Sequence, residues 1–110
     1  MRKSYNIESL EDFLIDFGLT PKQAAVYVAS LQLGPASIQD IAHKAETERT
    51  NIYDAVDELV SKGLISITTS GKRRLFVAQE PVALKSVLNE KERNLETVLP
   101  QLAMIYNDSS

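Results

Sequence analysis

The side chains best suited to recognising another molecule lie in one short segment, residues 47–53. Arg49 carries a planar fork of donors, and the amide of Asn51 holds donors and an acceptor side by side. Arginine can donate to guanine O6 and N7, and asparagine can pair with adenine N6 and N7. Nearby hydroxyls suit phosphates, and a threonine methyl suits the thymine methyl. The predicted DNA-reading residues are Thr47, Arg49, Thr50, Asn51 and Tyr53.

A basic cluster follows further along the chain. Residues 65–68 alternate apolar and polar side chains, which indicates a strand, and Ser70-Gly71 suits a turn before a returning strand at 75–77. We expect a two-stranded hairpin whose basic tip lies along phosphates or in the adjacent minor groove. The predicted contact residues of this tip are Ser70, Lys72, Arg73 and Arg74.

The predicted DNA-reading residues of segment 47–53 need a helix to present them, and we expect this helix to start at Thr47. Gly63 can adopt the left-handed conformation that ends a helix. Tyr53 adjoins the apolar Ile52, so it can either pack in the core or contact DNA, and the sequence leaves both open. The apolar stripe at helical spacing consists of Ile52, Val56, Leu59 and Val60.

A short helix precedes this one. Ser37 is a natural N-cap for a helix over residues 38–45, and only Glu46 to Glu48 separate that helix from the next. Two helices joined by so tight a turn form a helix-turn-helix. Glu46 stands where glycine is usual, and a non-glycine residue fills such a turn at modest strain. With the hairpin, and a small third strand near residues 36–38, the pattern predicts a winged helix-turn-helix: mainly α with a small β-hairpin.

Two more helices are expected before these. One covers residues 7–17 and ends at Gly18, with an apolar face that serves as core or as a dimer contact. The other opens at Thr20-Pro21, a cap followed by a preset φ, and stops at Gly34-Pro35. The apolar face of the first helix consists of Ile7, Leu10, Phe13, Leu14 and Phe17, and the predicted buried stripe of the second consists of Ala24, Tyr27, Val28 and Leu31.

Beyond Pro81 the apolar residues repeat at alternating intervals of four and three, a heptad pattern interrupted once by Lys91. Such a stripe has to pack either on the domain's own helices or on a second chain, and its regularity favours a homodimer through a long coiled-coil-like helix. Pro100 predicts a kink or break near Val98–Leu99. We therefore divide the chain into a DNA-binding domain, residues 1–80, and a dimerisation element, residues 81–110. The predicted dimer residues are Leu84, Leu88, Lys91, Leu95, Val98, Leu102 and Ile105.

Composition excludes several classes. The 110 residues are 44% hydrophobic and 25% charged, as in an ordinary globular domain. No apolar run or signal sequence suggests a membrane partner, and with no cysteine we expect a cytoplasmic location and no disulfide or thiolate metal site. His43 is the single histidine, and the four glycines form no phosphate-cradling loop, so no cofactor, metal site or enzymatic activity is predicted.

The net charge of −3 is unusual for a protein that binds a polyanion. Four basic residues and no acidic residue occupy positions 61–79, whereas positions 46–58 hold five acids and only Arg49. Attraction to DNA therefore has to come mainly from the hairpin tip, and a single reading unit, one helix-turn-helix with its hairpin, should bind DNA with modest affinity. The weak binding of one unit favours a dimer that presents two reading units to the DNA.

Several stretches in this order resemble the DNA-binding domain of the TrmB family of transcriptional regulators: FGLTPKQAAVYVASLQLGPASIQDIAHKA, RTNIYDAVDELVSKGLI and GKRRLFVAQEPVAL. The resemblance covers roughly residues 16–90. It implies a promoter-binding dimer with Arg49, Thr50, Asn51 and Tyr53 at the start of the recognition helix and Lys72, Arg73 and Arg74 in the wing. Family members often continue into a sugar-binding domain, which we do not expect in these 110 residues, whether they form a short member or part of a longer one.

Two other interpretations remain open. A winged helix can serve as a protein-binding adaptor without specific DNA binding, and the net negative charge, with Asp54, Asp57 and Glu58 displayed to a basic partner, favours this one. Alternatively, the C-terminal helix is the functional element and the winged domain only supports it. Activation or repression, the operator sequence and any small-molecule effector are not encoded in a recognisable pattern.

Overall fold

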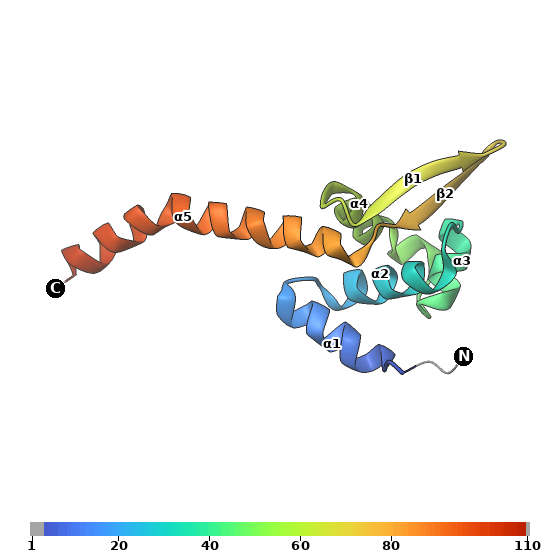
Figure 1. The fold of residues 1–110 in the computed structure, drawn as a ribbon, viewed down its shortest axis with the longest axis horizontal. Coiled ribbons are helices and arrows are strands. Elements are labelled where there is room, and N and C mark those ends of the chain that lie inside the picture. Colours follow the sequence, from blue (N-terminus) through green and yellow to red (C-terminus); the bar gives the residue numbers. More distant parts are fainter. Residues whose placement is uncertain (1–3, 110) are drawn as a thin grey trace. The chain divides into compact units, whose positions relative to one another are not determined.

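The computed structural model describes residues 4–109 (Figure 1). The chain divides into two compact units at Glu80–Pro81, and each is described by itself. Within the described residues, the first unit contains four α-helices, one 3-10 turn and a two-stranded antiparallel hairpin; the second contains a 3-10 turn and one long helix. The first unit is therefore mainly helical with a small β-hairpin, as predicted.

Helix α1 (Ile7–Phe17) starts and ends where the sequence indicates. Asn6 caps it by accepting the backbone N–H of Ser9 at 3.0 Å, and Gly18 closes it with φ 132. Of the apolar face, only Leu14 is buried and Phe13 is 58% exposed, so the core alternative holds for Leu14 alone and the dimer-contact alternative stays a prediction. The helix contacts α2 and leaves the rest of its apolar stripe partly or fully exposed.

Helix α2 (Pro21–Leu33) is the centre of the first unit. Thr20 and Gln23 form a reciprocal capping box at its start, each side chain bonding the other's backbone N–H at 3.1 Å. The helix contacts α1, α3, α4 and β2, so it is buried on more than one face and a single stripe does not describe it. For that reason Val26 is fully buried although it lies off the predicted stripe, and Leu31, which was predicted to be buried, is 42% exposed.

The helix-turn-helix consists of α3 (Ile38–Lys44), a 3-10 turn η1 (Arg49–Asn51) and α4 (Tyr53–Ser61). Ser37 caps α3 by accepting the backbone N–H of Asp40 at 3.2 Å. The predicted start of α4 at Thr47 is wrong by six residues. Residues 49–51 form a separate 3-10 turn instead, and the fully buried Ile52 lies between this turn and α4.

Glu46 occupies the glycine-like position of the turn with φ 56, as the sequence indicated. Its N–H donates to His43 O at 3.1 Å and the N–H of Thr47 donates to Ala42 O at 2.9 Å, the pair of bonds that closes a Schellman motif. Gly63 ends α4 in the same way with φ 78. Both helices of the motif therefore end in a left-handed residue, but only one of the two is glycine.

Replacing Glu46 with glycine should stabilise the first unit by about 0.5–1 kcal/mol, because it removes the left-handed strain of a residue with a Cβ atom. Glu48→Gly is the matched control: it removes the same charge two positions on, where φ is −75, and should destabilise through backbone entropy. Urea unfolding followed by circular dichroism measures both. A stability loss for Glu46→Gly as large as that for Glu48→Gly would contradict the strain assignment.

Strands β1 (Ile65–Ser70) and β2 (Arg73–Ala78) form the hairpin, with Ile65 opposite Ala78 and Ser70 opposite Arg73. The turn is therefore Gly71-Lys72, and Gly71 has φ 64, the sign that a type II′ turn requires at its first position. This corrects the prediction in two respects: Ser70 and Arg73 belong to the strands, and the expected returning strand begins two residues earlier. A single bridge between Ala36 and Phe76 supplies the small third strand.

The base of the hairpin is joined to the core. Ile65 and Phe76 are buried, whereas the rest of β1 is exposed, including Ile67 at 44%. The phenol of Tyr27 donates to Gln79 O at 3.2 Å, and the Gln79 amide donates to Ser66 Oγ at 2.7 Å. Burial raises the pKa of Tyr27, so this phenol remains a donor over the ordinary pH range.

The second unit is the 3-10 turn η2 (Pro81–Ala83) followed by α5 (Leu84–Asp108). The helix runs through Pro100 without interruption, so of the predicted kink or break the break does not occur. Figure 1 shows the helix bending in its C-terminal part. From Leu88 to Ser109 every residue is exposed, including the apolar positions of the heptad stripe. No helix within residues 4–109 is both long and apolar enough to cross a membrane.

Candidate nucleic-acid interface

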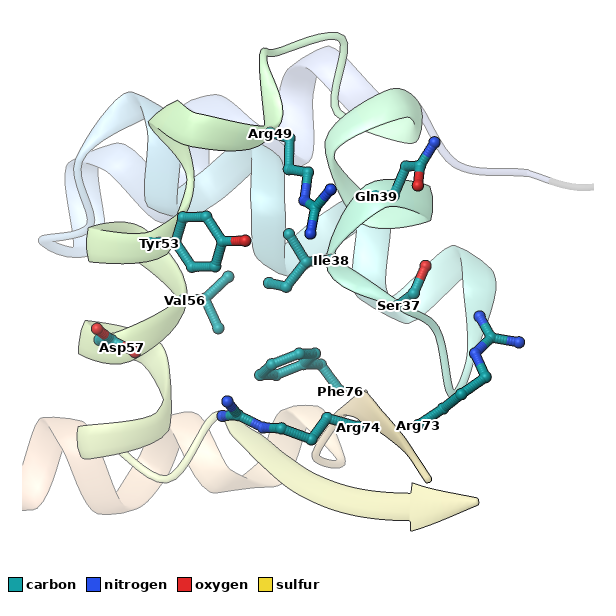
Figure 2. A pocket seen from close by; sticks show the side chains of 10 residues that line it. All are labelled: Ser37, Ile38, Gln39, Arg49, Tyr53, Val56, Asp57, Arg73, Arg74 and Phe76. Atoms are coloured by element: carbon teal, nitrogen blue, oxygen red, sulfur yellow. The ribbon is translucent and has the colours of Figure 1, made fainter. Parts of the chain in front are cut away.

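A hollow of about 520 Å³ opens on one face of the first unit (Figure 2). Its walls are the start of α3, the turn η1, the helix α4 and the strand β2. The residues that line it are Ser37, Ile38, Gln39, Arg49, Tyr53, Val56, Asp57, Arg73, Arg74 and Phe76. The hollow thus brings the helix-turn-helix and the hairpin to the same surface.

Arg49 and Tyr53 enter the hollow from the helix-turn-helix side. Arg49 belongs to η1 rather than to α4, and its exposed side chain points into the hollow in Figure 2. Ile52 takes the core position, whereas Tyr53 is 43% exposed and lines the hollow, so Tyr53 does not pack in the core and its contact with DNA stays a prediction. Within residues 4–109, Arg49 has no carboxylate within 4.0 Å, so its five donors are free for a ligand.

Arg73 and Arg74 enter from the hairpin side. Adjacent residues of a strand point to opposite faces, and Figure 2 shows Arg74 extending towards α4 while Arg73 extends towards Ser37. The guanidinium carbon of Arg74 lies 5.4 Å from the centroid of the Phe76 ring. Such a cation–π contact is worth about 0.5–1 kcal/mol at an exposed site and holds Arg74 over the hollow.

The other predicted contact residues surround the hollow without lining it. Thr47 is half-buried in the turn, and Thr50 and Asn51 are exposed in η1. Ser70 and Lys72 are exposed at the end of the hairpin. The structure therefore brings together four of the nine predicted residues, Arg49, Tyr53, Arg73 and Arg74.

Six lining residues were not predicted from the sequence as site residues. Val56 and Phe76 are buried and Ile38 is half-buried, so these three form an apolar floor that was predicted only as core and strand. Asp57 lies one helical turn after Tyr53, and that spacing was the one signal that could have placed it on the same face. Ser37 and Gln39 come from the segment around the α3 start, and the predicted small third strand near residues 36–38 was the signal that could have placed this segment beside the hairpin.

The acidic residues of α4 are distributed unevenly around the hollow. Glu58 faces Lys62, with Oε1 and Nζ 3.5 Å apart, whereas Asp57 has no salt bridge within the described part of the chain. His43 is exposed, and residues 4–109 contain no group of three or more side chains that could hold a metal ion. The hollow is therefore a mixed surface of three arginines, one carboxylate, hydroxyl and amide groups, and an apolar floor.

A helix-turn-helix of α3 and α4 that packs on α2, with a two-stranded hairpin beside it, defines a winged helix-turn-helix protein. The family model described as "Sugar-specific transcriptional regulator TrmB" matches residues 14–82, well over half of the chain. The chain belongs to the TrmB family, which is a family of transcriptional regulators and not of enzymes. The resemblance seen in the sequence is confirmed.

One curated protein is similar to this chain in sequence, and two solved structures are similar to it in fold. The HTH-type sugar sensing transcriptional regulator TrmBL1 of Pyrococcus furiosus is 26% identical over 102 residues, which are 92% of this chain and 30% of that protein. The solved structure of TrmBL2, described as an archaeal chromatin protein with a novel mode of DNA binding, has a TM-score of 0.81 at 18% identity, over 94% of this chain and 41% of that one. Transcriptional regulator Tm0710 from Thermotoga maritima has a TM-score of 0.57 at 18% identity, over 87% and 72%. The chain spans about a third of the length of the curated relative.

Proposed function

We propose that this chain is a sequence-specific DNA-binding transcriptional regulator that acts as a homodimer. The observation that supports it most strongly is the convergence of Arg49, Arg73 and Arg74 from two separate elements on one hollow. Arginine forks recognise both phosphates and guanine edges, and an acidic protein has little other reason to gather three of them on one surface. The name of the Pyrococcus relative describes sugar sensing, but our proposal concerns DNA recognition alone.

The start of α4 with η1 enters the major groove in this proposal. Arg49 donates to guanine and Asn51 pairs with adenine, while Thr47, Thr50 and Tyr53 contact phosphates or a thymine methyl. The hairpin follows the backbone or enters the neighbouring minor groove. The hairpin residues assigned to this contact are Ser70, Lys72, Arg73 and Arg74.

Two observations support dimerisation through α5. The first is the heptad stripe, whose members from Leu88 onwards are exposed in the single chain and would lie in water without a partner. The second is the net charge of −3, which makes one reading unit weak. Paired copies would present two units to half-sites about 10 bp apart. The proposed seam consists of Leu84, Leu88, Lys91, Leu95, Val98, Leu102 and Ile105.

The competing function is a protein-binding adaptor, favoured by the exposed acids Asp54, Asp57 and Glu58 on α4. The two functions differ in their response to salt. A DNA reader loses affinity for duplex steeply as salt rises, because each neutralised phosphate releases counterions, whereas an adaptor hardly binds duplex at any salt concentration.

Selection of bound duplexes from a random library tests the proposal. We expect an inverted repeat, which would establish the class of ligand, the two-fold symmetry and the half-site spacing together. Enrichment of single half-sites would contradict the dimer, and no enrichment at all would contradict DNA recognition.

Replacing Lys72 or Arg73 with glutamine should weaken binding to every duplex alike. The slope of log K against log salt should fall by about one for each phosphate that the variant no longer neutralises in a half-site. Titrations against the selected operator and a random duplex at several salt concentrations measure this. Lys85→Gln, in α5, removes the same charge outside the first unit and should leave the slope unchanged. A sequence-dependent loss for Lys72→Gln would instead make this residue a base reader.

A further inference from the structure

We propose that Asp57 determines base specificity at this interface, by accepting a hydrogen bond from the exocyclic amine of a cytosine and by disfavouring duplexes that offer no donor there. The inference rests on the proposed function and names one preference within it. It also assigns a role to a residue that neither the arginine cluster nor the core explains.

The position of Asp57 separates it from the other acids of α4. Tyr53 and Asp57 lie one turn apart, so they share a helical face, and both line the hollow with Arg49 and Arg74 (Figure 2). Asp54 does not line the hollow, and Glu58 is directed to Lys62 at 3.5 Å. Asp57 is thus the acid of α4 that faces the surface where DNA is expected.

Asp57 has no structural task that would account for this placement. Its side chain is exposed and has neither a salt bridge nor a side-chain hydrogen bond within residues 4–109. The nearby Arg74 rests on the Phe76 ring instead. Exchange of Asp57 for asparagine keeps the size of the side chain and should leave the fold unchanged, so its effect on binding can be read directly.

In a major groove, a carboxylate can bind only to base edges that offer a hydrogen-bond donor. An ionised carboxylate only accepts hydrogen bonds, and cytosine is recognised there through its N4 amine, by aspartate or glutamate. Beside phosphates, a carboxylate without a donor is repelled. Asp57 therefore favours a duplex with cytosine at the right position and lowers affinity for other duplexes, which complements the guanine contact of Arg49.

The experiment compares Asp57→Asn with Asp54→Asn, which removes the same charge from the same helix at a position outside the hollow. Both variants and the parent chain are put through duplex selection from one random library, and their affinities for the parent operator and for its variants at single positions are measured. For Asp57→Asn we expect the preference for cytosine at one position per half-site to fall about tenfold and adenine to be accepted there, because an asparagine amide can pair with adenine. For Asp54→Asn we expect stronger binding to all duplexes with unchanged base preference.

Identical base preferences in the parent and Asp57→Asn would overturn the inference while leaving the proposed function intact. The same result follows if Asp57→Asn shifts a preference for a base other than cytosine. If the parent itself enriches no duplex, the proposed function fails, and with it this inference. The parent's own selection separates the third outcome, failure of the proposed function, from the first two, in which only the inference about Asp57 fails.

Discussion

A chain carrying both Leu95→Asp and Leu102→Asp should be monomeric and should bind an inverted-repeat operator about 100-fold more weakly than the parent, because two linked reading units gain a factor of that order from effective concentration. Both leucines lie on the heptad stripe and are 52% exposed in the single chain. Two carboxylates facing their copies across the seam would have to be desolvated opposite like charges, which excludes pairing. Light scattering after size exclusion measures the oligomeric state, and titration of the operator measures the affinity.

Met104→Asp is the matched control for this pair. Met104 is also apolar and 63% exposed, but it lies two residues after Leu102, on the side of the helix that turns away from the stripe. This variant should remain dimeric and bind the operator like the parent. A monomeric parent at high concentration would reject the seam altogether, and equal effects of the two changes would show that α5 pairs by another face.

Arg49→Ala should weaken operator binding by about 1–3 kcal/mol for each half-site and should relax base preference at one base pair in each. The physical reason is the loss of a bidentate donor to guanine. Because Arg49 is exposed and makes no salt bridge within the described chain, stability should hardly change. Competition titrations with operators altered at single positions separate a loss of specificity from a loss of attraction.

Arg93→Ala, in α5, removes the same side chain outside the reading surface and serves as the control for net charge. It should leave base preference untouched. If Arg49→Ala discriminated among operator variants as the parent does, the residue would only attract phosphates, and the major-groove assignment of η1 would be wrong.

Much of the fold could be predicted because its helix ends are encoded locally. Thr20 with Pro21, Ser37 and Gly63 each satisfy or close a helix terminus through their own chemistry, and each acts where it was expected. The errors concern neighbours that the sequence does not reveal. Leu31 lies on α2, which contacts four other elements, so one apolar stripe does not predict which of its residues are buried. The start of α4 was misplaced because the sequence does not show that Ile52 is buried immediately before it.

The site was only partly predictable for a similar reason. Arg49 and the hairpin arginines carry guanidinium donors that suit phosphates and guanine, so they could be predicted as DNA-contact residues from the sequence alone. Asp57, Gln39 and Ser37 became site residues only when the hairpin lay against the helix-turn-helix, and that packing is a long-range event. The same packing made Phe76 a support for Arg74 rather than simply a strand residue.

The bridge at Phe76 has a consequence for the thermodynamics of recognition. Two backbone bonds, of 2.8 and 3.1 Å, tie Phe76 to Ala36 just before α3, so the inner part of β2 and the helix-turn-helix form one frame. The groups on this frame are preorganised, and association requires little loss of conformational entropy from them. Beyond Ile67 the hairpin lacks such support and is free to adapt to the curvature of the duplex. Specificity should therefore reside in the rigid inner part and tolerance of DNA shape in the outer part.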